Sequence, residues 1–201
     1  MWFRIATLAA IVNLALLTGC PATGTDGGDG QDTTGATSLV GTWTGSIECS
    51  RTESLNGGTP GSPVRTTIAL TITFDADGFP DAILIMGYSN TPDASADIAR
   101  TGDTDTIEST AGSADVTDVV TVSKATYTAT SVRLEIDIDH SGGGGNLTLD
   151  GTGQQVVEIT LNNDGTLDYS STTTYDVQQT AGAVSFDTAS DETCTGTLTK
   201  Q

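Results

Sequence analysis

The sequence predicts an antiparallel all-β domain, an up-and-down β-barrel of about eight to ten strands, with a β-sandwich as the alternative. Apolar and polar residues alternate from Val64 to Asp75, and the alternation returns from Val132 to Asp139. A period of two with many β-branched side chains is typical of strands that bury one face. After the first twenty residues, only the segment 91–100 could hold a short helix.

Turn signals separate the expected strands. Asp77-Gly78, Asp164-Gly165 and the glycine run 142–145 all favour tight turns, and short connections indicate an antiparallel meander. The segment 83–86 is apolar on both faces, so we expect it to be covered on both sides or to lie where the sheet curls over. The expected strands, some of which should merge, lie near 42–49, 64–75, 82–88, 104–108, 116–127, 132–139, 147–149, 156–161, 166–177, 184–187 and 194–199.

The chain begins with the features of a secretory signal segment. Arg4 supplies a positive charge, and the run from Ile5 to Leu17 is apolar apart from Thr7 and Asn13. This run is shorter than the roughly 18–20 residues that span a bilayer as a helix. We therefore expect residues 1–19 to be removed as a signal peptide.

The segment Leu17-Thr18-Gly19-Cys20 resembles the lipobox of bacterial lipoproteins. The resemblance implies cleavage before Cys20, a diacylglycerol on its sulfur and an acyl chain such as palmitate on its new amino group. Several acyl chains hold a protein firmly at a membrane, whereas one binds reversibly. The resemblance also implies a place in the bacterial cell envelope, with the domain in the periplasm or at the cell surface. Pro21, in place of an aspartate, favours the outer membrane, and an ordinary secretory signal with an incidental cysteine is the alternative.

A flexible spacer is expected to follow the lipidated cysteine, so that residues 20–38 form the tether and residues 39–201 the β-barrel domain. The stretch from Pro21 to Thr37 is rich in Gly, Thr and Asp and has no aliphatic residue larger than alanine. Such a composition cannot bury enough apolar surface to offset its chain entropy. A phosphate-binding glycine loop is disfavoured because no strand is expected before it and no helix after it.

The chain is strongly acidic, with 7 Lys and Arg against 26 Asp and Glu and a formal net charge of −19 at pH 7. Loss of Arg4 with the signal peptide makes the charge −19 − 1 = −20. A surface this acidic repels phosphates, which argues against nucleic-acid binding. Solubility or life in salty water explains the acidity better than a specific cationic partner does.

The two remaining cysteines, Cys49 and Cys194, form an even pair in an exported, oxidising setting, which predicts a disulfide. It would close a loop of 194 − 49 = 145 positions. The loop-entropy model gives about 4–5 kcal/mol for loops of this order. Trp43, Ile47 and Cys49 share one face of the expected first strand, and Cys194 shares a face with Leu198 of the last. A disulfide between these strands, across the core or along a closing seam, favours a closed barrel.

A second resemblance is carried by residues 39–45, which read LVGTWTG. The G-x-W pattern is similar to the opening of lipocalins and of lipocalin-like bacterial lipoproteins. The resemblance implies an eight-stranded barrel whose closed end is plugged by Trp43, although the family's later signatures are not identifiable. Such a barrel either encloses a small ligand or is filled by side chains. The residues expected to line or fill it, and so to bind a small apolar ligand, are Trp43, Ile47, Ile68, Leu70, Ile72, Leu134 and Ile136.

Two acidic turns, 75–78 and 162–165, echo the first half of a calcium-binding loop. An EF-hand loop would need a glutamate at its twelfth position, where Met86 stands. Simple hairpin turns explain both segments, so no resident cofactor is expected. Asp75 and Asp77 are kept as candidate ligands of another kind of calcium site, as is the pair Asp137 and Asp139.

No arrangement of residues indicates catalysis. His140, the single histidine, is expected to be exposed at a strand end, and no nucleophile signature marks a serine. A thiol nucleophile at Cys49 is disfavoured because the one basic residue near it in sequence is Arg51. We therefore predict that the protein is not an enzyme.

Together these observations predict a non-catalytic, membrane-anchored envelope lipoprotein whose barrel binds a small apolar ligand. The alternative is a structural or interaction module of the envelope, which would use its Thr- and Asp-rich outer face and bind calcium. A tightly filled core would favour the module, and a cavity of several hundred Å³ would favour the ligand carrier. The sequence indicates neither the ligand nor the oligomeric state.

Overall fold

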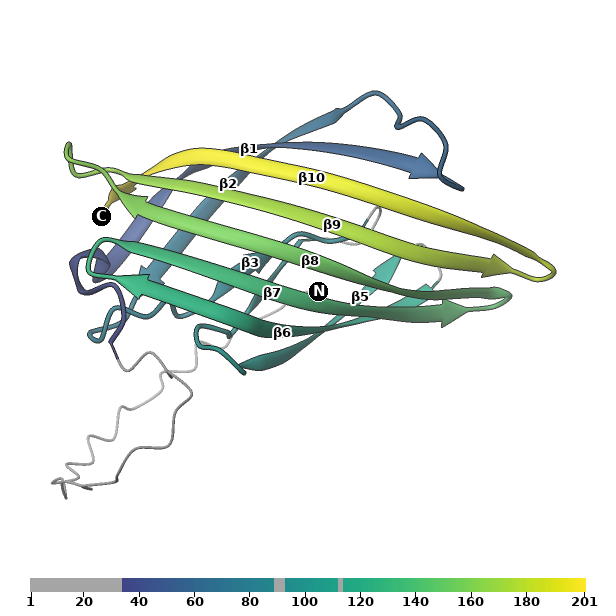
Figure 1. The fold of residues 1–201 in the computed structure, drawn as a ribbon, viewed down its shortest axis with the longest axis horizontal. Helices are drawn as coiled ribbons and strands as arrows, with labels where there is room; N and C mark the ends of the chain where they lie inside the picture. The colour runs from purple at the N-terminus through teal and green to yellow at the C-terminus, as the bar shows by residue number, and fades with distance from the viewer. Residues whose placement is uncertain (1–33, 89–92, 112–113) are drawn as a thin grey trace, which may run out of the picture. The chain divides into compact units, whose positions relative to one another are not determined.

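The computed structural model describes residues 34–88, 93–111 and 114–201, which are built almost entirely of antiparallel strands. Eight strands form one sheet in the order β2-β1-β10-β9-β8-β7-β6-β5, and the sheet curls into a half-barrel (Figure 1). The predicted all-β, barrel-like fold is confirmed. The eight strands are β1 Gly41–Leu55, β2 Val64–Phe74, β5 Thr104–Ala111, β6 Ala114–Thr128, β7 Ser131–Gly144, β8 Leu147–Leu161, β9 Leu167–Ala181 and β10 Val184–Lys200.

The sheet is open, whereas the position of the cysteines led us to favour a closed barrel. β2 and β5 stand at the two ends of the strand order, and among the described strands β2 pairs with β1 alone and β5 with β6 alone. β1 and β10 pair with each other inside the sheet rather than at a closing seam. The chain between β2 and β5 leaves the sheet instead of joining its two edges.

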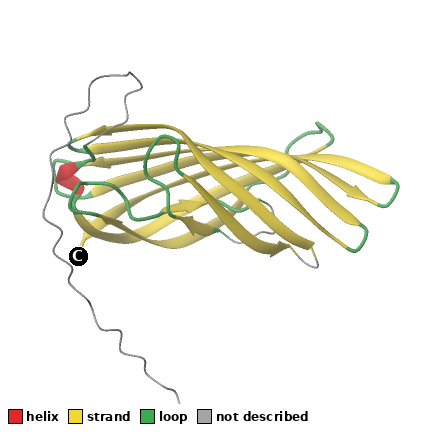
Figure 2. Cartoon of the chain, turned by 90° about the horizontal axis from the view of Figure 1, so that it is seen from below, coloured by secondary structure: helices red, strands yellow, loops and turns green. Residues whose placement is uncertain are grey.

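This connecting chain, residues 75–88 and 93–103, is here called the insert. It carries β3 (Ile83–Ile85) and β4 (Ala94–Ala96), which pair with each other as a second, two-stranded sheet. Loops of the insert run along one side of the curled sheet in Figure 2. Ile83 and Ile85 are almost fully buried, in agreement with the expectation that this apolar segment is covered. The described part of the predicted short helix, residues 93–100, contains β4 and no helix.

The alternation of residue types sorts each long strand into a concave and a convex face. In β7 the side chains of Val132, Leu134, Ile136 and Ile138 are buried, while Asp137 and Asp139 are exposed. Several expected strands merge because their pairing continues without interruption: 147–149 and 156–161 both belong to β8, and 184–187 and 194–199 to β10. Gly142–Gly144 also pair as strand, so the predicted glycine turn shrinks to Gly145, whose φ is 63°.

Described residues that precede the predicted boundary at residue 39 pack against the insert. The amides of Gly35 and Ala36 donate to the carbonyls of Asp77 and Gly78, at 3.1 and 2.8 Å, and Ala36 is fully buried. A short 3-10 helix, η1 (Thr37–Leu39), then leads into β1. Small residues fit here because an added Cβ at Gly35 would lie 2.4 Å from the Gly78 backbone. The signal peptide, Cys20 and most of the predicted spacer lie in residues 1–33, outside the described residues.

A glycine substitution tests the close packing of the strands. A Cβ at Gly151 in β8 would lie 2.3 Å from the carbonyl oxygen of Asp176 in β9. We expect Gly151→Ala to lower the free energy of unfolding by about 1–3 kcal/mol, because the backbone must shift to accept the methyl group. Gly61→Ala is the matched control, since its Cβ would meet only Glu53 O at an ordinary 3.6 Å. Equal denaturation midpoints for the two variants would contradict this packing.

Candidate functional site

The residues expected to line a ligand cavity lie together in the core. Six of the seven are buried and Ile68 is partly buried, and all of them belong to or pack against one apolar cluster. The same cluster contains Ile83, Ile85 and Met86 of the insert. The insert therefore occupies the concave side on which a carried ligand would have to lie. The seven residues form part of a packed core of the half-barrel.

Trp43 has a definite structural role at the start of β1. It is 2% exposed, and its indole nitrogen donates a hydrogen bond of 2.6 Å to the carbonyl of Leu39, which ends η1. A buried carbonyl at a helix end needs such a donor. The ammonium of Lys200 lies 5.3 Å from the centre of the indole ring, within the range of a cation–π contact. These contacts fix the entry of the chain into the sheet.

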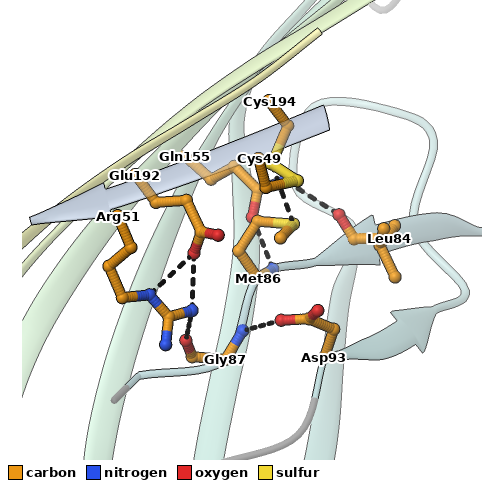
Figure 3. The surroundings of a disulfide bond; sticks show 9 residues. All are labelled: Cys49, Arg51, Leu84, Met86, Gly87, Asp93, Gln155, Glu192 and Cys194. Atoms are coloured by element: carbon orange, nitrogen blue, oxygen red, sulfur yellow. Dashed lines mark hydrogen bonds and ion pairs between the residues drawn. A yellow bond between two sulfur atoms is a disulfide. The ribbon is translucent and has the colours of Figure 1, made fainter. Parts of the chain in front are cut away.

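The predicted disulfide joins Cys49 of β1 to Cys194 of β10. The two residues stand directly opposite each other in neighbouring strands, so the bond lies within the sheet and not across the core. Both are buried on the concave face, and the Met86 sulfur lies 3.9 Å from that of Cys194 (Figure 3). The bond thus sits beneath the insert.

Polar side chains of the sheet hold the insert in place around the disulfide (Figure 3). Gln155 accepts a hydrogen bond from the amide of Met86 at 3.1 Å and donates one to the carbonyl of Leu84 at 2.8 Å. Arg51 donates to the carbonyl of Gly87 at 2.6 Å and to the carboxylate of Glu192 at 2.9 Å. The bonds to the backbone of Leu84, Met86 and Gly87 satisfy groups that would otherwise be buried without partners, a state that costs free energy.

Sequence reasoning missed the ion pair of Arg51 and Glu192, although a signal for it exists. The two residues are 141 positions apart, but they are register partners two places beyond the cysteine pair. Antiparallel pairing fixes every opposite pair once one is known. Had the two cysteines been placed directly opposite each other in paired strands, the same register would have predicted the pair of Arg51 and Glu192.

His140 is buried, and the expectation of an exposed histidine at a strand end is wrong. The reason is that β7 continues to Gly144, so His140 stays on the concave face two places after Ile138. Its Nδ1 shares a hydrogen bond of 2.6 Å with Asp118, its register partner in β6. The rings of Tyr88 and Tyr175 lie 5.0 and 6.0 Å from the imidazole.

A carboxylate that orients an imidazole is part of a hydrolytic triad, but this pair lacks the other requirements. Within the described residues, Nε2 of His140 has no hydrogen-bond partner, and hence no nucleophile bonded to it. The exposed fractions of the His140 and Asp118 side chains are 0% and 5%, so a substrate could not reach the imidazole. In this arrangement the pair serves to hold β6 and β7 together in the core.

The convex face carries an open depression of about 610 Å³ across the middle of the sheet. Its walls are polar, and the side-chain nitrogen Nε2 of Gln154 donates a hydrogen bond of 3.2 Å to the carboxylate of Asp137. Carboxylates attract cations, and hydroxyl groups can donate or accept hydrogen bonds. The residues that line the depression are Thr121, Asp137, Ile138, Asp139, Thr152, Gly153, Gln154, Thr174 and Asp176.

Asp75 and Asp77, the predicted calcium ligands, lie in a turn that the Asp75 side chain stabilises. Oδ1 of Asp75 accepts hydrogen bonds from the amides of Asp77 and Phe79, both at 2.9 Å. This is the local bonding that favours aspartate in turns. Within the described part of the chain, the one cluster of three acidic, cysteine or histidine side chains close enough to share an ion is Cys49, Glu192 and Cys194. A calcium site at Asp75 or Asp77 stays a prediction.

No helix of the described residues has the length and apolar character needed to cross a membrane. Comparisons of the chain with protein-family models, with curated proteins and with solved structures find no match.

The buried pair of Asp118 and His140 can be tested by substitution. Removing one partner leaves the other buried and uncompensated, so Asp118→Ala or His140→Ala should lower the free energy of unfolding by about 3–5 kcal/mol. The double variant Asp118→Leu/His140→Leu should lose much less free energy of unfolding than the sum of the losses of the two single variants. Glu158→Gln is the control, because it breaks an exposed ion pair with Arg133 and should change stability little. Additive losses in urea unfolding would show that the two side chains act independently.

Two buried tyrosines predict sensitivity to alkali. Burial raises the pKa of Tyr169 from 10.0 to about 12, and burial also raises the pKa of Tyr175. Each hydroxyl binds its proton more tightly in the folded state, so its contribution to stability is complete below pH 10.0 and is lost as the pH rises toward 12. We expect phenolate absorbance from these residues to appear together with the loss of strand signal in circular dichroism. Tyr169→Phe should move that transition to higher pH, and ionisation of Tyr169 near pH 10 in the folded protein would contradict its burial.

Proposed function

We propose that the protein is a lipoprotein of the bacterial cell envelope whose all-β domain is a non-catalytic interaction module. The signal-like residues 1–19 and the lipobox-like motif ending at Cys20 support the anchor. Gly35, whose amide donates to the carbonyl of Asp77, lies 35 − 20 = 15 residues after Cys20. A stretched segment of this length reaches about 50 Å, which would let the domain meet partners away from the lipid surface.

The filled concave face is the observation that favours a module over a ligand carrier. Residues of the insert share one core cluster with the residues expected to bind a ligand. A carrier would need a cavity there, lined by apolar side chains and large enough for the ligand. The G-x-W resemblance at Gly41 to Trp43 supports the carrier as the second candidate.

The convex face is the surface that this module would offer to a partner. It is lined by threonine, serine and aspartate side chains, and the aspartates cluster on the strands around the open depression. Polar, charged contacts of this type give specificity and fast association, and they weaken as salt screens them. A partner bound here would therefore be released by raised ionic strength. Asp137, Asp139 and Asp176 line the depression, and Asp150, Asp187 and Asp191 are further exposed aspartates of β8 and β10.

Native mass spectrometry of the lipid-modified chain, taken from the envelope in detergent, tests the proposal with and without a calcium chelator. We expect the mass of the processed and acylated chain with no small molecule retained, because the core is filled by its own side chains. A retained apolar molecule would contradict the module and support the carrier. A mass shift removed by the chelator would support the calcium-binding form of the module. A Cys20→Ala chain found at the same membrane with the same acyl mass would contradict the anchor.

A further inference from the structure

The surroundings of the disulfide contain a set of donors suited to a metal ion. One donor atom each of Cys49, Glu192 and Cys194 lies within 4.8 Å of the other two. The thioether sulfur of Met86 lies 3.9 Å from the sulfur of Cys194 and points at the pair from the insert (Figure 3). All four residues are buried, so an ion bound among them would be shielded from water.

The sulfur spacing fits coordination to a common ion. Two sulfurs that each bind one ion at about 2.3 Å stand roughly 3.8–4.0 Å apart. The sulfurs of Met86 and Cys194 already have this separation, at 3.9 Å. In the dithiol form the sulfurs of Cys49 and Cys194 are no longer bonded to each other. The two thiols and the Met86 thioether then provide three sulfur donors beneath the insert.

The donor types indicate which metal the site would take. Glu192 is held by Arg51 through a hydrogen bond of 2.9 Å, so its carboxylate is already engaged. The remaining donors are two thiolates and one thioether, which are soft ligands that select Cu(I) over harder ions. We propose that the dithiol form of this protein binds one Cu(I) ion through Cys49, Cys194 and Met86. This inference is independent of the proposed envelope anchor.

The disulfide and the metal site exclude each other, because a cysteine binds a metal ion as a thiolate. The dithiol exists in the chain before oxidation. It also forms when a small dithiol reductant exchanges with the bond: the reductant gives up two electrons and two protons and becomes a disulfide itself. Each cysteine then loses its thiol proton on binding Cu(I). In the reverse exchange a small disulfide takes up two electrons and two protons and becomes a dithiol, which restores the Cys49–Cys194 bond and would release the ion.

The test uses the full chain in detergent, reduced anaerobically with a dithiol, freed of reductant and titrated with Cu(I) supplied as its bicinchoninate complex. We expect one Cu(I) per folded chain and no transfer to the disulfide form. Met86→Leu keeps the volume of the side chain but removes the thioether, and should lower the affinity at least about tenfold. Ile85→Leu is the matched control in the neighbouring buried position and should leave the affinity unchanged. A Cys20→Ala chain, measured in parallel, removes the contribution of an unmodified Cys20 thiol.

Further variants separate the proposed site from its competitors. Cys49→Ser/Cys194→Ser should abolish transfer, Glu192→Gln should not alter it, and X-ray absorption at the copper edge should show sulfur ligands. The proposal is overturned by three results: no transfer, transfer to a chain without strand signal in circular dichroism, or an affinity that Met86→Leu does not change. Tighter binding of Zn(II) that Glu192→Gln weakens would assign the cluster to zinc and would also overturn it.

Discussion

The pairing of β1 with β10 is the constraint on which the rest of this structure depends. It runs without interruption from Trp43 opposite Lys200 to Leu55 opposite Thr188, and so joins the two ends of the domain. Contacts this distant in sequence carry a large cost in chain entropy, which the Cys49–Cys194 bond lowers by restricting the unfolded chain. The same register places Arg51 opposite Glu192.

Because β1 and β10 meet inside the sheet, the two edges fall to β2 and β5 and the barrel does not close. The connection between these edges covers the concave face instead, and Ile83, Ile85 and Met86 complete the core. Apolar packing alone would leave the backbone of the insert without partners. Side chains of the sheet satisfy it, as Gln155 does for Met86 and Leu84 and as Tyr175 does at the carbonyl of Met86.

The two faces of the sheet consequently differ in the chemistry they offer. The convex face has carboxylates and hydroxyls around an open depression, which suits a reversible, salt-dependent partner. The concave face has its sulfur and charged groups under cover, where the removal of water strengthens electrostatic interactions. The protein thus combines an open polar outer face with a disulfide-containing core that the insert covers.

The sequence by itself determined the all-β fold, the disulfide and the faces of most strands, because a period of two assigns each side chain to one side. It did not determine that the sheet stays open, that Gly142–Gly144 pair as strand, or that His140 meets Asp118. Those features depend on which strands are neighbours and in what register, and periodicity within one strand contains no information about its neighbours. Only the tertiary structure shows that Met86 lies beside the cysteine pair, because 108 positions of the chain separate it from Cys194.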